Sequence, residues 1–415
     1  MTRWHKRIWI TGCALLVAVA AFQLAQVASG ATPAASLAHR DFANLWSGGR
    51  LIAMGDWATL YDPASFTAQQ ARWVGSFGHR VFSYPPTAFM LIEPFALLPY
   101  GFAFAAWLIA TGLFFVATAW RWWPEGAGSP WLALLMPAAL FNASLGHFGF
   151  VFGGLWLLAF ALLPRRPVIA GLTIGLFAMK PQLAVLIPLL LLLRRDWRAI
   201  AATAVGTGGL VLTSAALYGT TAWTAFLTRA VRTQAGFIDA HGASFARLST
   251  SAATAVFELG GSAALAFGAQ ALLALLGVGL VVQAVRRGVA LDRLAPLGAT
   301  ATFLVLPYAL SYDLTAVSVG ALGLMIDPAA RRTERALGAI GFVAPQIGVA
   351  AALLGAPIMS LMLAGLAVGQ FRTATIALAG GRGRNAEGSW TRLKMSAGAF
   401  LPKRASSTTA IRPNG

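Results

Sequence analysis

The stretch His39-Arg40-Asp41-Phe42-Ala43-Asn44-Leu45-Trp46 follows directly after the first long apolar segment of the chain. Its carboxylate stands out because the 415 residues of the sequence include only 13 Asp and Glu. A helix that has just left a membrane would place Asp41 at the boundary with water. Ionisable residues at membrane depth are costly and commonly serve function. Asp41 is therefore the first candidate for chemistry, and the alternative is a carboxylate that only caps a helix.

The composition indicates a membrane protein. Hydrophobic residues make up 58% of the chain, charged residues make up 11%, and the mean hydropathy is +0.71. A soluble protein of this length would need far more charge on its surface. Apolar runs long enough for membrane helices recur along nearly the whole chain, and none shows the alternation of a β-barrel strand. The sequence therefore predicts an all-α polytopic integral membrane protein.

The formal charge of +18 does not indicate a nucleic-acid partner. The basic residues occur as short pairs between apolar runs and in a basic tail, which is typical of cytoplasmic loops near anionic lipid. They do not form a basic face with interleaved aromatic residues. The single cysteine, Cys13, lies inside the first apolar run, which excludes a disulfide framework or a thiolate metal site. We expect no metal, no cofactor and no nucleic acid.

The basic clusters also predict the topology. Arg3, Lys6 and Arg7 place the N-terminus in the cytoplasm, before an uncleaved first helix over about 8–28. With about twelve crossings in total, this first helix included, every later basic cluster and the C-terminus lie on the cytoplasmic side of a bacterial inner membrane. This count treats 85–100, which prolines interrupt, as an outer-surface or re-entrant helix. The other expected crossings are 102–120, 130–144, 147–163, 168–179, 182–193, 199–217, 262–285, 294–310, 312–326, 336–354 and 357–373.

This topology predicts a single membrane domain over 1–375 and a basic, disordered cytoplasmic tail over 376–415. Two large extracytoplasmic loops are expected, at 30–101 and 218–261, and the first should carry juxtamembrane helices. Most ionisable residues outside the basic clusters fall in outer loops and turns, so we expect the chemistry there. On that side a bacterium offers no sugar nucleotides, and a group-transfer enzyme would need a membrane-borne donor such as a polyprenyl phosphate sugar. Its phosphate could be bound by cations at Lys180, Arg80, Arg229, Arg232 and Arg247.

Four segments, in order, resemble a known family. Asp41-Phe-Ala-Asn-Leu-Trp46, followed by Gly55-Asp56-Trp57 and Tyr61-Asp62-Pro63, resembles the first outer loop of glycosyltransferase family 87. The other three segments are Phe82-Ser-Tyr-Pro-Pro86, Ala170 to Pro181 and Pro307 to Leu314. At Leu145-Gly146-His147, histidine stands where the family often has glutamine. The resemblance covers roughly residues 1–375.

The resemblance implies a GT-C-type bundle with a catalytic Asp, here Asp41, as the general base for an acceptor hydroxyl. It further implies that a hexose, with mannose as the expected sugar, moves from a polyprenyl phosphate donor to a lipid-linked or cell-envelope acceptor without a metal. Lys180 is the best match for binding the donor phosphate. The other candidate substrate-binding residues are His147, Arg80, Tyr84, Asp313, Trp46 and His241.

Two other functions stay open on the residues alone. A multi-helix transporter or flippase of a lipid-linked substrate would usually show matched halves with interrupted helices, and the sequence shows no such internal symmetry. A ligase that joins whole glycans typically has one large outer loop, which 218–261 could provide. That loop does not distinguish a ligase from an enzyme that transfers single sugars.

Overall fold

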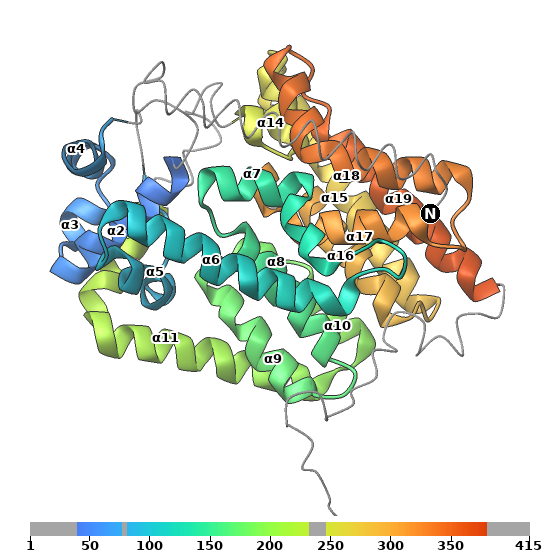
Figure 1. Ribbon diagram of the computed structural model, residues 1–415, viewed down its shortest axis with the longest axis horizontal. Helices are drawn as coiled ribbons and strands as arrows, with labels where there is room; N and C mark the ends of the chain where they lie inside the picture. Colours follow the sequence, from blue (N-terminus) through green and yellow to red (C-terminus); the bar gives the residue numbers. More distant parts are fainter. Residues whose placement is uncertain (1–39, 77–80, 232–245, 380–415) are drawn as a thin grey trace, which may run out of the picture.

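The computed structural model describes residues 40–76, 81–231 and 246–379. These residues form packed helices without a β-strand (Figure 1), and a single isolated bridge joins Ser249 to Leu310. The prediction of an all-α membrane protein is confirmed. The expected first crossing over 8–28, the candidates Arg80 and His241, and residues 380–415 of the expected tail lie outside the described residues.

The first expected loop folds into short helices that pack together at one end of the bundle (blue in Figure 1). They are α2 (Arg40–Met54), α3 (Trp57–Leu60), α4 (Pro63–Val74), η1 (Pro86–Ala88) and α5 (Phe89–Ala96). Asp56 and Asp62 cap α3 and α4 by accepting from backbone N–H groups. The eight residues of α5 extend only about 12 Å, far less than a bilayer core of about 30 Å. This length agrees with the interpretation of 85–100 as a non-spanning segment.

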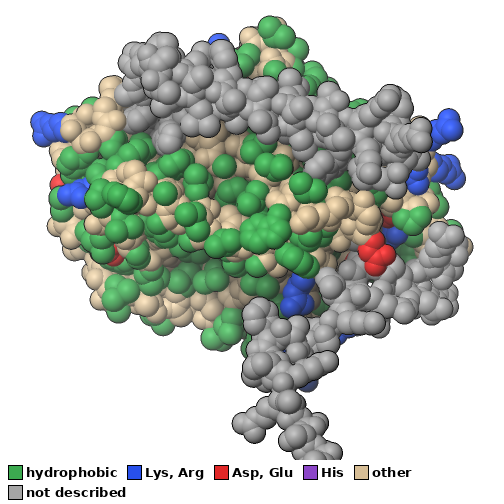
Figure 2. All heavy atoms as spheres, viewed as in Figure 1, with side chains coloured by type: hydrophobic (Ala, Val, Ile, Leu, Met, Phe, Trp, Pro, Cys, Tyr) green, Lys and Arg blue, Asp and Glu red, His purple; other side chains and the backbone are tan. Residues whose placement is uncertain are grey.

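Within the described ranges, five helices are long and apolar enough to cross a membrane. They are α6 (Tyr100–Ala119), α11 (Trp197–Ala225), α15 (Ala263–Arg286), α18 (Arg332–Leu353) and α19 (Met359–Ala379). Leucines such as Leu212 on α11 and Leu275 on α15 are exposed, as expected of surfaces that face lipid. Figure 2 shows one face of the molecule with many hydrophobic and few charged side chains. These helices define a multi-pass membrane protein.

The other apolar helices are shorter than the expected crossings. They are α7 (Pro137–Leu145), α8 (Gly149–Leu162), α9 (Pro167–Gly175), α10 (Ile187–Arg194), α16 (Leu291–Val305) and α17 (Thr315–Ile326). With 8 to 15 residues each, they extend about 12 to 22 Å. The count of twelve full crossings is therefore not confirmed. The expected helix over 130–144 is wrong as a single element, because η3 (Pro130–Leu135) ends before Pro137 starts α7.

Short 3-10 and π turns fill most of the connections between these helices. They are η2 (Trp120–Trp122), η4 (Leu176–Met179), η5 (Pro181–Ala184), η6 (Phe226–Ala230), η7 (Ala246–Leu248) and η8 (Ser311–Asp313). The short helix α14 (Ala252–Glu258) packs against α15. The second expected loop, 218–261, is thus partly helical, and α11 continues into it. Gly219, with φ of 77°, bends α11 near the expected start of that loop.

Three pairs of short helices meet at their turns. The α7–α8 turn contains His147, the α9–α10 connection contains Lys180, and the α16–α17 connection contains Asp313. Thr315 Oγ1 donates to the carbonyl of Gly149 at 2.6 Å, which joins the first turn to the third. A Cβ at Gly149 would lie 2.1 Å from the carbonyl oxygen of Tyr312, so only glycine permits this approach.

The first-loop helices attach to the same region. Thr87, in η1, donates through Oγ1 to the carbonyl of Ala178 at 2.8 Å, two residues before Lys180. Gly146 closes α7 with φ of 71°, and a Cβ there would lie 2.6 Å from the Cβ of Phe42 in α2. The start of α2, the segment after Val81 and all three turns therefore meet in one place.

Candidate functional site

The centre of the site is a buried ion pair between Lys180 and Asp313. Lys180 Nζ lies 2.6 Å from Asp313 Oδ2, and both side chains are almost fully shielded from solvent. Lys180 stands in a non-helical conformation between η4 and η5, and Pro181 follows it. The pair therefore joins two interhelical turns. Burial raises the pKa of the Asp313 carboxyl, and Lys180 offsets part of that rise.

His147 and Tyr84 form a second polar pair beside the first. The Tyr84 hydroxyl lies 2.6 Å from His147 Nε2. Burial, assisted by the charge of Lys180, lowers the pKa of His147 well below its ordinary value. Burial raises the pKa of Tyr84, and the negative charges of Asp41 and Asp313 raise it further. Both side chains are therefore neutral near pH 7 and suited to hydrogen bonding rather than to carrying charge.

Tyr312 connects the two pairs. Its ring centroid lies 4.1 Å from that of His147, and Lys180 Nζ lies 5.5 Å from the same ring, within the range of a cation–π contact. We did not predict a site role for Tyr312 from the sequence. The sequence feature that could have indicated this role is the position of Tyr312 next to Asp313, in a polar turn between two apolar runs. Tyr308 lies in the same connection. Burial raises the pKa of its hydroxyl, and the charges of Asp41 and Asp313 raise it further.

Asp41 lies in the first turn of α2, at the edge of this cluster, and is partly buried. After burial, its negative charge is the largest cause that raises the pKa of Tyr84, and the same holds for Tyr312. Asp41 is therefore electrostatically coupled to the residues around Lys180. The structure thus gathers five predicted site residues: Asp41, Tyr84, His147, Lys180 and Asp313.

Several buried polar atoms around the cluster lack a hydrogen-bond partner among the described residues. They are His147 Nδ1, Asp313 Oδ1, Asn142 Nδ2 and Ser311 Oγ. Leaving such an atom unsatisfied costs about 1–3 kcal/mol, so a concentration of them indicates a place for a polar ligand or ordered water. In the described part of the chain, no group of three or more His, Cys, Asp and Glu is arranged to hold a metal ion.

The other predicted residues lie elsewhere. Trp46 is packed inside the first-loop helices, where its Nε1 donates to the Leu98 carbonyl at 3.0 Å. Its ring contacts Arg50, Trp73 and Tyr100, so the structure gives it a packing role instead of the expected sugar contact. Arg229 donates to the Ala58 carbonyl, and Arg247 is exposed. Arg80, Arg232 and His241 fall outside the described ranges.

A multi-pass helical membrane protein with a buried polar cluster at interhelical turns is the class that fold and site define. The model of glycosyltransferase family 87 matches residues 82–307, which is more than half of the chain. The protein belongs to glycosyltransferase family 87, which confirms the resemblance seen in the sequence and makes it a membrane glycosyltransferase.

Comparisons with solved structures and with curated proteins give no further information about the site. The crystal structure of ArnT from Cupriavidus metallidurans in the apo state is similar with a TM-score of 0.30 and 16% identity, over 92% of this chain and 78% of that chain. A likeness at this level carries no argument about the site. No curated protein matches the sequence.

Proposed function

We propose that the protein transfers one hexose, with mannose as the proposed sugar, from a polyprenyl phosphate donor to a hydroxyl of a lipid-linked or cell-envelope acceptor. The reaction would take place on the extracytoplasmic side of a bacterial inner membrane. The observation that carries this proposal is the buried pair of Lys180 and Asp313, surrounded by Tyr84, His147 and the charge of Asp41. A cation, a carboxylate and neutral hydrogen-bonding groups are the components that such a transfer needs.

Lys180 is the proposed ligand of the donor phosphate. Its ammonium has three N–H donors, and one of them is directed to Asp313. The remaining donors can form charge-assisted bonds to phosphate oxygens. When the bond between the anomeric carbon and the phosphate oxygen breaks, negative charge grows on the leaving phosphate. A fixed cation lowers the energy of that transition state.

Asp41 is the proposed general base. As the acceptor oxygen bonds to the anomeric carbon, its proton passes to the Asp41 carboxylate, and polyprenyl phosphate leaves from the opposite face with inversion. A single carboxylate suffices for this direct displacement. The N-terminal turn of a helix favours a negatively charged side chain, so the position of Asp41 in α2 suits this role.

The sugar of the donor is proposed to lie among Tyr84, His147 and Asp313. His147 Nδ1 and Asp313 Oδ1, which have no partner among the residues that the structure describes, are available for sugar hydroxyls. Arg80 and His241 remain proposed contacts from the two large loops. The domain division, with one membrane domain over 1–375 and a cytoplasmic tail over 376–415, is part of the same proposal, although α19 continues to Ala379 and includes the first four residues of that tail.

The proposal is tested with membranes that contain the full chain and radiolabelled polyprenyl phosphate mannose. We expect a lipid-extractable or envelope product that carries one additional labelled sugar and is absent from membranes without the protein. A parallel reaction with polyprenyl phosphate glucose identifies the sugar. Transfer of an intact glycan from a diphosphate lipid would make the protein a ligase. Movement of the labelled lipid between leaflets without transfer would make it a flippase, and either result overturns the proposal.

A further inference from the structure

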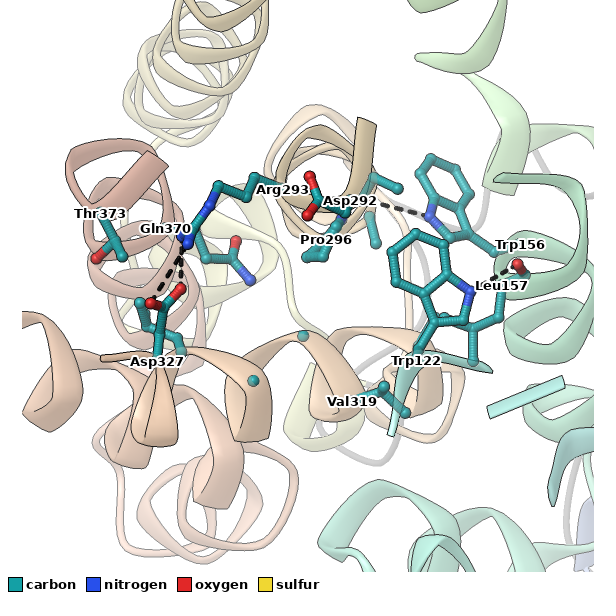
Figure 3. Close-up of a pocket in the computed structure, with 16 residues that line it drawn as sticks. Trp122, Trp156, Leu157, Asp292, Arg293, Pro296, Val319, Asp327, Gln370 and Thr373 are labelled. Carbon is teal, nitrogen blue, oxygen red and sulfur yellow. Dashed lines mark hydrogen bonds and ion pairs between the residues drawn. The ribbon is translucent and has the colours of Figure 1, made fainter. Parts of the chain in front are cut away.

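A hollow runs along α17 to the end of that helix opposite Asp313. Its lining comes from α8, α16, α17 and α19 together with Trp122 (Figure 3). Asp313 precedes the first residue of α17, whereas Asp327 follows its last residue. The twelve residues of α17 extend about 18 Å. The polar end of the hollow, near Asp327, is therefore remote from the cluster around Lys180, whereas its apolar lining reaches Ala316 in the first turn of α17.

One end of the hollow is polar, and several of its polar atoms have no hydrogen-bond partner among the described residues. Both amide atoms of Gln370, the hydroxyl of Thr373 and Oδ1 of Asp292 have no hydrogen-bond partner in the described part of the chain. Gln370 is 6% exposed and Thr373 is 1% exposed, so bulk water does not compensate them. Figure 3 shows the Gln370 amide beside Arg293, on the same side of the hollow as Asp327 and Thr373. Unpaired groups buried this deeply indicate that something is bound among them.

The unpaired groups favour a ligand that donates hydrogen bonds and carries positive charge. Gln370 Oε1 and Asp292 Oδ1 can only accept, and Gln370 Nε2 is the one atom of the set that can only donate. Arg293 is already engaged, because its Nη1 lies 2.5 Å from Asp327 Oδ2. The charge of Arg293 also acts on Asp292, so two carboxylates share one cation, and Asp292 Oδ1 is left for an outside donor.

The rest of the hollow is apolar and aromatic. The indole N–H groups of Trp122 and Trp156 already donate to the carbonyls of Leu157 and Ala295. These rings therefore offer their carbon faces to an occupant, and such faces attract both hydrocarbon and cations. Val319 and Leu324 add aliphatic walls. The side chain of Arg293 keeps 21% exposure, so the polar end reaches the surface.

We propose that this hollow binds an amphiphile with a primary ammonium head and a hydrocarbon chain, which in a membrane is a phospholipid of the ethanolamine type. The ammonium bonds to Asp292 and Gln370, and the chain lies against Trp122 and Val319. Such a lipid would connect α16, α17 and α19 at the end of the bundle away from the proposed catalytic cluster. The inference does not depend on the identity of the transferred sugar.

The test uses the purified full chain in mild detergent, with equal amounts of phosphatidylethanolamine and phosphatidylglycerol that carry the same acyl chains. Native mass spectrometry then counts the retained lipids. We expect at least a roughly tenfold preference for phosphatidylethanolamine, because one charge-assisted hydrogen bond is worth about that factor. D292N should remove most of this preference. The matched control is D196N, which changes a carboxylate that pairs with Arg194 outside the lining and should leave the preference intact.

A filling variant separates lipid binding from folding. Val319→Trp occupies the apolar part without changing charge, and it should lower retention of phosphatidylethanolamine while cooperative thermal unfolding persists. Equal retention of both lipids, preference for phosphatidylglycerol, or an unchanged preference in D292N would overturn the proposal. Retention of no lipid by the wild-type protein would overturn it as well.

Discussion

Lys180 and Asp313 are 133 residues apart in the sequence, and their side chains form a buried ion pair with Nζ 2.6 Å from Oδ2. A buried pair gains little net stability, because the cost of removing two charges from water offsets their attraction. Its place at the junction of three helix pairs is therefore better explained by function. In the proposed mechanism, the pair holds a cation ready for the donor phosphate without leaving that cation unpaired in the empty protein.

This view predicts that stability and activity can be separated at the pair. Lys180→Met leaves the Asp313 carboxylate buried without its cation, which should cost about 3–5 kcal/mol of stability. The double variant Lys180→Met with Asp313→Leu should regain most of that loss, because both charges are gone. It should nevertheless bind no donor. Thermal unfolding in detergent and a donor-binding assay measure the two effects, and sugar transfer by the double variant would make Lys180 a purely structural residue.

At His147 we predict that glutamine is tolerated and leucine is not. The glutamine side chain can keep a hydrogen bond to the Tyr84 hydroxyl, whereas leucine leaves that hydroxyl buried and unpaired. An unsatisfied buried group costs about 1–3 kcal/mol, which corresponds to roughly a 10- to 100-fold loss if it falls on the transition state. Steady-state transfer rates of H147Q and H147L check this. Equal rates for the two variants would show that the hydrogen bond is not used.

His147 also predicts how stability depends on pH. Burial, and then the charge of Lys180, lowers the pKa of His147 in the folded protein below the ordinary value of about 6.5. Below that pH the unfolded chain takes up a proton that the folded site does not, so the free energy of unfolding falls as the pH drops. The loss begins near pH 7 and can reach about 1.4 kcal/mol per pH unit.

The variant H147Q lacks the titrating ring and should lose this part of the acid sensitivity. Thermal unfolding midpoints measured between about pH 8 and pH 5 give the comparison. Parallel curves for the wild type and H147Q would mean that His147 is protonated as easily in the folded protein as in the unfolded chain.

Glycine at position 149 should be required for the site to form. A Cβ there would lie 2.1 Å from the Tyr312 carbonyl oxygen, so G149A must push the α8 turn away from the turn of Asp313. We expect a loss of about 1–3 kcal/mol together with lower activity. The matched control is G208A on α11, where a Cβ meets nothing within 4 Å. That change should be neutral or slightly stabilising, because alanine favours helices. Similar unfolding temperatures for the two variants would contradict the close approach.

The sequence predicted individual site residues better than their mutual contacts. His147, Lys180 and Asp313 were identifiable because each interrupts apolar runs with a polar turn, and such turns are expected at one membrane boundary. The pairing of Lys180 with Asp313 was not predictable, since it depends on how three helix pairs pack. The contacts of Tyr312 were missed for the same reason.

The lengths of the helices and the role of Trp46 were harder to predict from the sequence. Apolar runs predict where helices occur, but Pro137 and Pro188 stand in the first turns of α7 and α10, inside runs that were expected as single crossings, so these crossings became shorter helices. Trp46 was a candidate because it lies close to Asp41 in the sequence. Five residues along a helix turn a side chain to a different face, and there its indole bonds to Leu98.

The central claim is that Asp41 accepts the proton from the attacking hydroxyl while Lys180 binds the donor phosphate. The most direct measurement compares single-turnover transfer and donor binding in D41N with those in D62N, where asparagine can still cap α4. We predict that D41N binds the donor normally and transfers sugar roughly 100- to 10,000-fold more slowly, whereas D62N behaves like the wild type. Normal transfer by D41N, with expression and membrane insertion intact, would contradict the account.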